Sequence, residues 1–300
     1  MLIYYTDHFV LPLPPGHRFP MAKYAELRRR VSHSPWLPAG ALREPPALDD
    51  ATLALAHSPD YIRRVVTGAL SAAEQRRIGF PWSERMVERS RRAAGATYAA
   101  CLSALSCGAG VNLAGGTHHA HADHGEGFCV FNDSAIAARA MQAEGRVGQV
   151  AVIDCDVHQG NGTAAILHGD DSVFTCSLHG ARNWPLDKAS SDLDIALPDG
   201  TGDQDYLEAL DEALDQTFRR ARPALVIYLS GADPWEGDRL GRLALSKDGL
   251  LARDRKVFEA CLARGVPVAV TMGGGYAPDF HDSVDIHYAT VHAAFACFGR

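Results

Sequence analysis

The fold can be read outward from residues 150–162, VAVIDCDVHQGNG. Residues 150–153 form a short apolar run rich in β-branched side chains, which is typical of a strand covered on both faces, as in parallel sheets. Asp154, Asp156 and His158 follow this run directly. Because ligands of open α/β sheets bind just beyond the carboxyl ends of the strands, the stretch predicts a polar site at the edge of a parallel sheet.

Comparable apolar runs recur along the chain and alternate with helix-like stretches. Strands are predicted at residues 2–5, 111–114, 150–153, 173–176, 225–229 and 266–271, and helices at residues 83–107, 132–144, 203–220, 248–264 and 279–298. This alternation predicts an α/β fold with a mostly parallel sheet. We find no linker, repeat or break in composition, so we expect one domain over residues 1–300.

The composition is that of an ordinary globular protein. Of the 300 residues, 47% are hydrophobic and 22% are charged, and the net charge is -7 with neutral histidines. This balance gives no electrostatic footprint for nucleic acid or for an anionic membrane surface. Two arginine clusters, at residues 28–30 and at Arg89, Arg91 and Arg92, are mixed with glutamates, and we interpret both as solvated helix faces.

The chain has seven cysteines, an odd number without a CxxC pair, and most of them lie in apolar runs. This pattern predicts buried thiols rather than a disulfide framework, and a reducing compartment. The N-terminus lacks the features of a signal peptide, and no stretch approaches the roughly 18 apolar residues of a membrane span. We therefore expect a cytoplasmic protein, whose oligomeric state is not readable from the sequence.

Three further strand exits carry unusual polar residues. The segment GGTHHAHADHGEGF (115–128) follows the second predicted strand, SGADPWEGD (230–238) follows the fifth, and MGGGY (272–276) follows the sixth. Parallel strands end at the same edge of a sheet. Histidine, aspartate and tyrosine at four strand exits therefore predict one composite site.

Asp156 and His158 are predicted to bind a metal ion. Side chains two residues apart on an extended segment point the same way, so both can chelate one ion. Asp233 in the SGADP segment is the natural third ligand, and this set leaves a position open for water, as in catalytic zinc sites. In an alternative interpretation the aspartates cap the next helix and His158 is a core histidine, but Asp233 and the tandem histidines favour the metal.

The adjacent histidines His118 and His119 cannot both face a metal from a regular strand, so we assign them to acid–base work from a loop. A neutral histidine near a metal can take a proton from water and later protonate a leaving amine. His121 and His124 are interpreted as solvated or structural. Tyr276 could offer its hydroxyl to an oxyanion, although GGGY alone favours a tight turn with a packing tyrosine.

Together these segments resemble the zinc-dependent histone deacetylase family, which has the arginase–deacetylase fold. The resemblance rests on five segments that agree in order and spacing: GGTHHAHADHGEGFCVFND (115–133), IDCDVHQGNGT (153–163), CSLHG (176–180), GADPWEGDRLGRL (231–243) and GGGY (273–276). Gln159, Asn161 and the EGDRLGRL run (236–243) look closest to the class IV histone deacetylases and to bacterial histone deacetylase-like amidohydrolases.

The resemblance implies a fold, two ions and a reaction. The fold is a three-layer α/β/α arrangement with a central, mostly parallel eight-stranded sheet. One Zn²⁺ would be bound by Asp156, His158 and Asp233. A structural K⁺ would be held at Asp154, Asp156, His158, Ser177 and Leu178. The reaction would hydrolyse an acylated amine, with N6-acetyl-lysine or another acyl-lysine in protein as the first expectation; acetylpolyamines, other small acylated amines and long-chain acyl-lysine are the alternatives.

The resemblance also implies roles for single residues. His119 would be the principal general base and acid, His118 would act mainly through its charge, and Tyr276 would polarise the acyl carbonyl. Asp154 would stand behind the first histidine and Asn161 behind the second. The acyl-lysine channel would be lined by Gly127, Phe128, Trp184 and Gly274. Arg18 would match an arginine below the pocket.

One position departs from the class I pattern. Asn161 stands where class I members have an aspartate, and an amide stabilises the charge of an imidazole less than a carboxylate does. The protonation state of His119 therefore stays open. A ureohydrolase on the same fold would need two manganese ions and an Asp-x-Asp pair, whereas SGADP has one carboxylate, which favours one metal. A non-catalytic acyl-lysine module is disfavoured because His119 and Tyr276 are both present.

Overall fold

The computed structural model describes residues 1–14 and 16–299. Its centre is an eight-stranded sheet in which every strand pair is parallel. The strands are β1 (Leu2–Tyr4), β2 (Leu42–Arg43), β3 (Ala109–Asn112), β4 (Val150–Asp154), β5 (Val173–Gly180), β6 (Leu193–Leu197), β7 (Leu225–Ser230) and β8 (Val268–Met272). Their order across the sheet is β2-β1-β3-β8-β7-β4-β5-β6.

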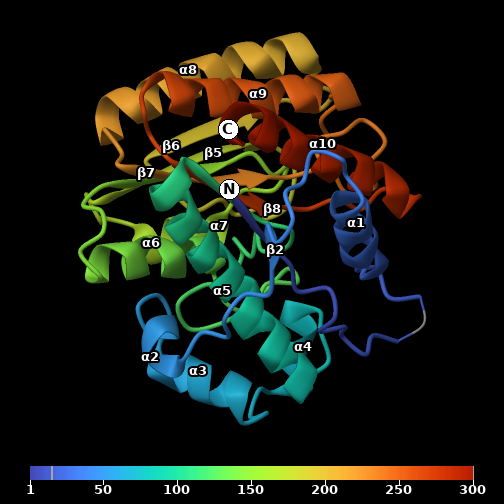
Figure 1. The fold of residues 1–300 in the computed structure, drawn as a ribbon. Coiled ribbons are helices and arrows are strands. Elements are labelled where there is room, and N and C mark those ends of the chain that lie inside the picture. The colour runs from blue at the N-terminus through green and yellow to red at the C-terminus, as the bar shows by residue number, and fades with distance from the viewer. Residues whose placement is uncertain (15, 300) are drawn as a thin grey trace.

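Helices cover both faces of this sheet. They are α1 (Ala22–Ser32), α2 (Asp50–Leu53), α3 (Pro59–Val66), α4 (Ala72–Ile78), α5 (Glu84–Cys107), α6 (Asp133–Ala143), α7 (Asn161–Leu167), α8 (Asp203–Ala221), α9 (Lys247–Ala263) and α10 (Phe280–Phe298). Figure 1 shows α8, α9 and α10 on one face, α5, α6 and α7 on the other, and α2 to α4 beyond α5. The predicted three-layer α/β/α architecture is confirmed.

The strands are apolar because both of their faces are buried. In β4, Ala151 and Ile153 belong to the core on the α8–α10 side, whereas Val150 and Val152 belong to the core on the α5–α6 side. Successive side chains of a strand point to opposite faces, so a strand between two helical layers needs an apolar residue at every position. This requirement is the physical origin of the runs from which the strands were predicted.

The sheet order places the four polar strand exits side by side. β3, β8, β7 and β4 are the four central strands, and each is hydrogen-bonded to the next. Because all pairs are parallel, their carboxyl ends lie at one edge. The segments that follow these strands therefore converge, which is why residues more than 100 positions apart can form one site.

Two strands and several helices were not predicted. β2 has only two residues, and β6 at the sheet edge alternates partly buried and exposed side chains instead of forming an apolar run. α2, α3, α4 and α7 have four to eight residues, too few for a clear helical period. Such short helices are marked by their caps; in α4, Ser71 and Glu74 form a capping box.

The interpretation of Arg89 as a solvated residue is wrong. Arg89 is buried, with 7% of its surface exposed, and its guanidinium donates a hydrogen bond to the carbonyl of Thr6 and lies 4.6 Å from the centre of the Tyr24 ring. Arg91 and Arg92 do form surface ion pairs with acidic residues. The cluster is thus split because α5 turns one of its three arginines toward the interior.

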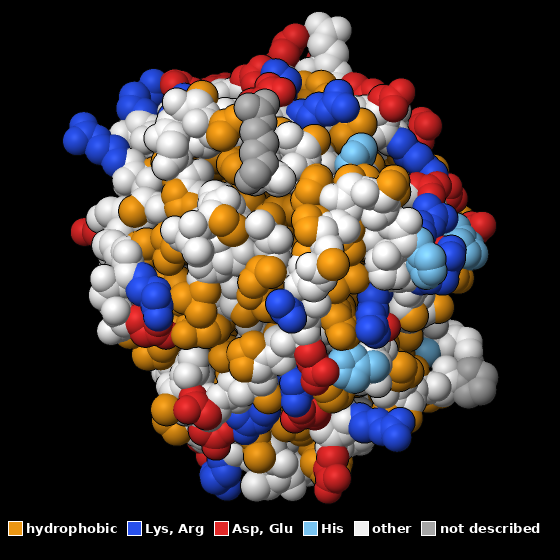
Figure 2. Space-filling model, in the orientation of Figure 1, with side chains coloured by type: hydrophobic (Ala, Val, Ile, Leu, Met, Phe, Trp, Pro, Cys, Tyr) orange, Lys and Arg blue, Asp and Glu red, His pale blue; other side chains and the backbone are white. Residues whose placement is uncertain are grey.

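The seven cysteines form no disulfide, and five of them are buried, as predicted. On the face shown in Figure 2, basic and acidic side chains are interspersed, with apolar side chains between them. Among the described residues, none of the helices combines the length and apolar character needed to cross a bilayer.

Candidate active site

Asp156, His158 and Asp233 meet at the carboxyl edge of the sheet. Asp156 and His158 follow β4, and Asp233 follows β7, the neighbour of β4. Nδ1 of His158 lies 3.0 Å from Oδ1 of Asp156 and 3.2 Å from Oδ2 of Asp233. One potential ligand atom of each residue lies within 4.8 Å of the others. The structure thus brings together the three residues that the sequence predicts as metal ligands.

This donor set fits a divalent cation. The side chains of Asp156 and Asp233 are 1% and 0% exposed, and Oδ2 of Asp233 has no hydrogen-bond donor among the described residues. Burial, and then repulsion by Asp156, raise the pKa of Asp233 to about 7. Two buried carboxylates are unfavourable unless a positive charge accompanies them. A cation bound by both carboxylates and by His158 would provide that charge.

The glycine run explains how the chain passes this group. A Cβ atom on Gly274 would lie 1.9 Å from Oδ2 of Asp233 and 2.9 Å from Oδ2 of Asp156. The backbone N–H of Gly274 donates a hydrogen bond of 2.5 Å to that same oxygen of Asp156. Only glycine fits such a close approach, so the GGGY segment is more than a tight turn.

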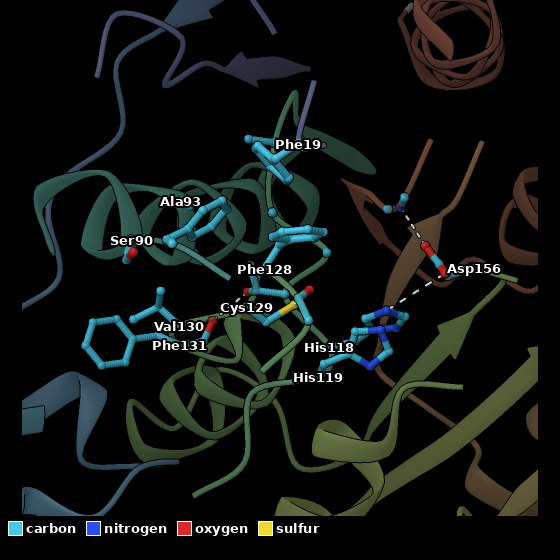
Figure 3. Close-up of a pocket in the computed structure, with 18 of the residues that line it drawn as sticks. Phe19, Ser90, Ala93, His118, His119, Phe128, Cys129, Val130, Phe131 and Asp156 are labelled. Carbon is cyan, nitrogen blue, oxygen red and sulfur yellow. Dashed lines mark hydrogen bonds and ion pairs between the residues drawn. The ribbon is translucent and has the colours of Figure 1, made fainter. Parts of the chain in front are cut away.

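The two adjacent histidines lie beside the carboxylates. His118 and His119 are both buried, and their ring centroids are 4.0 Å apart. Nδ1 of His118 lies 2.6 Å from Oδ2 of Asp154, and Nδ1 of His119 lies 2.7 Å from Oδ1 of Asn161. Asp154 and Asn161 therefore stand behind the first and the second histidine, in the order that the resemblance implies. Figure 3 shows the two rings beside each other, with a dashed line from Asp156 to the ring of His118, whose Nε2 lies 3.9 Å from Oδ1 of Asp156.

The two imidazoles differ in charge. Burial lowers the pKa of His118, but attraction by Asp154 and Asp156 outweighs it and raises the pKa to about 9. Burial, and then the imidazoles of His118 and His158, lower the pKa of His119 well below its usual value. At neutral pH His118 is charged and His119 is neutral, so His119 is the imidazole that can accept a proton.

A cavity of about 70 Å³ is lined by both histidines, by the three predicted metal ligands and by Tyr276. Burial, and then the charges of Asp233 and Asp156, raise the pKa of Tyr276 well above its usual value. Its hydroxyl therefore keeps its proton and can act as a hydrogen-bond donor.

The predicted channel residues lie around this cavity. Gly127, Phe128 and Gly274 line it. The rings of Phe128 and Tyr276 are 6.1 Å apart between centroids. Trp184 is not among the residues that line the cavity, but the Trp184 ring is 4.5 Å from that of His119 between centroids, and a Cβ on Gly127 would lie 3.2 Å from it. Trp184 and Gly127 thus lie against each other beside His119.

Two buried basic residues of the cavity were not predicted from the sequence. Lys23 and Arg89 both line it, and Lys23 Nζ lies 3.4 Å from the carbonyl oxygen of Gly275. Arg18 does not line this cavity but lies in surface depressions beside His17, so its predicted place below the pocket is wrong. Helical spacing could have indicated Lys23, because it shares the buried face of α1.

A buried arginine ties the two ligand-bearing segments together. Arg253 in α9 donates hydrogen bonds to the carbonyls of Cys155 and Gly231, at 3.1 and 2.7 Å. Cys155 directly precedes Asp156, and Gly231 lies two residues before Asp233. The guanidinium therefore fixes both segments relative to each other. No local sequence signal marks Arg253, because α9 resembles any other helix with charged residues.

The comparison with known families decides what kind of protein this is. Residues 17–291 match the family described as histone deacetylase domain. The chain belongs to the histone deacetylase family. It is 31% identical over 269 residues to histone deacetylase 2 of Arabidopsis thaliana, and the aligned region covers 87% of this chain and 70% of the relative. It is 33% identical over 253 residues to the histone deacetylase-like amidohydrolase of Pseudomonas aeruginosa, covering 78% and 66%.

A relative of nearly equal length is an uncharacterized protein of Picosynechococcus sp., 43% identical over 293 residues and covering 98% of this chain and 97% of the relative. Among solved structures, a histone deacetylase homologue from Aquifex aeolicus superposes with a TM-score of 0.82 at 23% identity, covering 98% and 83%. Acetylpolyamine aminohydrolase from Burkholderia pseudomallei superposes with a TM-score of 0.77 at 22% identity, covering 100% and 98%.

These matches confirm the arginase–deacetylase fold and the predicted family. As a histone deacetylase family member with amidohydrolase relatives, this protein is a hydrolase that acts on amides.

Proposed function

We propose that this histone deacetylase family member is a zinc-dependent deacylase, built as one catalytic domain, that removes the acyl group from N6-acyl-lysine in protein, with acetyl as the preferred group. The observation that carries the proposal is the meeting of Asp156, His158 and Asp233 beside a charged His118 and a neutral His119. That combination offers a cation site, an electrostatic group and a proton acceptor within one cavity.

The residues divide the reaction between them. Asp156, His158 and Asp233 would hold a divalent ion such as Zn²⁺, which would supply Lewis acidity to the acyl carbonyl and lower the pKa of water. His119 takes a proton from the attacking water at Nε2, because its Nδ1 is engaged with Asn161. The same Nε2 then gives the proton to the departing amine.

Two further groups act on developing charge. His118, kept positive by Asp154, stabilises the negative charge that forms on the substrate. The protonated hydroxyl of Tyr276 donates a hydrogen bond to the carbonyl oxygen as it becomes an oxyanion.

We also propose a structural K⁺ on the far side of the ligand segment. Ser177 on β5 lies in register opposite Asp154 on β4, with Leu178 next along the strand. Carboxylate, hydroxyl and carbonyl oxygens are available where β4 and β5 end, and such oxygens suit a hard monovalent cation. The residues that would surround the K⁺ are Asp154, Asp156, His158, Ser177 and Leu178.

The test is a substrate panel with the purified, zinc-loaded protein. Peptides of one sequence carrying acetyl-, butyryl- or myristoyl-lysine are compared with acetylated putrescine and spermidine, with and without a chelator. We expect the highest kcat/KM on acetyl-lysine peptide, loss of turnover with the chelator, recovery on adding Zn²⁺, and about one bound ion per chain. A higher kcat/KM on an acetylpolyamine than on the peptides would mean that small acylated amines, and not proteins, are the substrates. If none of these amides is hydrolysed, the proposed deacylase function is wrong.

A further inference from the structure

The side chains behind His119 continue beyond Asn161. Nδ2 of Asn161 donates a hydrogen bond of 2.7 Å to Oε1 of Glu126, while Oδ1 of Asn161 lies 2.7 Å from Nδ1 of His119. A carboxylate is thus present behind His119 as well as behind His118, but one residue further away. Glu126 lies in the segment between the tandem histidines and the channel glycine Gly127.

The chemistry of these groups fixes the direction of every hydrogen bond. An ionised carboxylate can only accept, so the amide of Asn161 must turn its NH₂ group toward Glu126. The carbonyl oxygen of Asn161 then faces His119, and because that oxygen can only accept, the proton of the neutral imidazole must sit on Nδ1. Nε2 of His119 is left with a free lone pair.

Without Glu126, Nδ2 of Asn161 would keep one hydrogen-bond contact among the described residues, 3.2 Å to Nε2 of His121, and that nitrogen accepts only when it carries no proton. The amide of Asn161 would then have a weaker preference. Its two ends are nearly equal in shape, and a half-turn about the last side-chain bond would present NH₂ to His119. The imidazole would then accept at Nδ1 and carry its proton on Nε2. In that tautomer His119 could not take a proton from water at the nitrogen that faces the cavity.

Glu126 remains ionised in its surroundings. Its side chain is 16% exposed, and Nε2 of His121 lies 3.4 Å from Oε1. Burial raises the pKa of Glu126, but the hydrogen bonds from His121 and Asn161 outweigh it, so the pKa lies below its usual value. His124 stacks on His121 at 4.4 Å and bonds in turn to Asp123, so these are the titratable groups that face Glu126 from its own loop.

We propose that Glu126 is a positioning residue for His119: through the amide of Asn161 it selects the imidazole tautomer with the proton on Nδ1. The inference rests on the proposed function, which assigns proton transfer to Nε2 of His119. It also gives the segment around His121 and His124, which we interpreted as merely solvated or structural, a part in holding the carboxylate.

This arrangement separates two properties that a direct carboxylate would combine. Asp154 both orients His118 and makes it a cation. Glu126, acting through a neutral amide, orients His119 and leaves its pKa low, where burial and the neighbouring imidazoles place it. His119 must be neutral to act as a base, and this arrangement orients its ring without making the ring a cation.

The test is a charge swap in the zinc-loaded enzyme. Glu126→Gln removes the carboxylate that can only accept a hydrogen bond from Asn161, and Asn161→Asp places two carboxylates against each other. Each variant should lower kcat on the acetyl-lysine peptide by about 10-fold or more, with little change in KM. In the double variant, the carboxylate at position 161 accepts from both His119 and the new amide at position 126. That carboxylate also raises the pKa of His119, so we expect kcat to recover to within about 3-fold of the parent only at a pH above the raised pKa, with the pH profile shifted upward.

A second readout does not depend on turnover. The ¹⁵N shifts of the His119 ring, identified by comparison with His119→Gln, should report a proton on Nδ1 in the parent and in the double variant, and a mixture of tautomers in Glu126→Gln. Asp199→Asn is the control, since it removes a surface carboxylate that pairs with Arg242 and does not contact Glu126 or Asn161, and it should change neither kcat nor the spectrum.

The outcomes distinguish the two proposals. If Glu126→Gln keeps both the parent spectrum and the parent kcat, or if the double variant is no better than the single variants, the positioning role is overturned. If the parent hydrolyses no acylated amine while the ring spectra change as expected, the deacylase proposal fails and the assignment of Glu126 stands.

Discussion

His118 and His119 are consecutive residues, and their rings lie 4.0 Å apart, yet a carboxylate stands behind one and an amide behind the other. Asp154 and Asp156 raise the pKa of His118 to about 9 against the effect of burial, whereas burial and two imidazoles lower the pKa of His119. The same side chain thus becomes a cation in one place and a neutral base a few ångströms away. The charges and burial around each ring, more than its position in the loop, decide its chemistry.

The largest expected effect follows from removing the carboxylate of Asp156, which lies 3.9 Å from the imidazole of His118 and 3.0 Å from that of His158. Asp156→Asn should abolish metal content and lower kcat/KM by about 1000-fold or more, since the ion supplies several kcal/mol of charge stabilisation. Metal analysis and turnover of the same preparation test this. Asp199→Asn, a surface carboxylate paired with Arg242, is the control and should keep both. Full metal content with full turnover in Asp156→Asn would contradict the ligand assignment.

The next test breaks the comparison directly. His119→Gln should lower kcat by about 100- to 10,000-fold, the range for loss of a general base. His118→Gln should cost less, about 30-fold or roughly 2 kcal/mol of charge stabilisation, because His118 acts through its charge. The measurement is kcat on the acetyl-lysine peptide at pH 8. An equal or reversed order would mean that the roles of the two histidines have been assigned the wrong way round.

A smaller effect should follow when the surroundings of His118 are made to resemble those of His119. Asp154→Asn replaces the carboxylate by an amide, and we expect kcat to fall by about 10-fold, as for other groups that hold a catalytic imidazole. Adding His118→Gln to this variant should lower kcat little further than His118→Gln alone, because both changes remove the same charge. If the fold-losses in kcat of the two single variants multiply in the double variant, Asp154 contributes to turnover independently of the charge on His118.

A third buried imidazole, that of His57, extends the comparison to the free energy of unfolding. His57 has no carboxylate partner; its Nδ1 bonds to the carbonyl of His121 and its Nε2 accepts from the N–H of Asn132. Burial lowers its pKa from 6.5 to about 4. The unfolded chain therefore binds a proton at higher pH than the folded protein does. The contribution of His57 to the free energy of unfolding should be complete above pH 6.5 and be lost as the pH falls toward 4.

Between pH 7.5 and pH 5, this single group should lower the free energy of unfolding by about 2 kcal/mol. Urea unfolding at the two pH values measures the loss, and His57→Gln should show a smaller pH dependence than the parent. The same slope in both proteins would mean that His57 is not the group responsible.

Much of the fold and the centre of the site could be predicted because they depend on local pattern. Strands buried on both faces need continuous apolar runs, and the ligands Asp156, His158 and Asp233 directly follow two such runs. Edge strand β6 and the short helices escaped prediction, since their sequences carry neither an apolar run nor a helical period.

What could not be predicted depends on contacts between distant segments. Nothing near Glu126 in the sequence indicates that it meets Asn161, 35 positions later. Arg89 was missed for the same reason: it lies in a helix with exposed charges, and only the packing of α5 turns it toward the cavity. Tertiary placement overrides the usual tendency of charged residues to be exposed.

The position of β8 has a consequence for biosynthesis. β8 is the last strand to leave the ribosome, yet it lies between β3 and β7 in the middle of the sheet. Until it emerges, the nascent chain can form only two separate ribbons, β2-β1-β3 and β7-β4-β5-β6, each with an open edge. One ribbon carries the tandem histidines and the other carries the proposed metal ligands. A translating chain therefore keeps the two groups of site residues apart, and the site can assemble only after β8 has been synthesised.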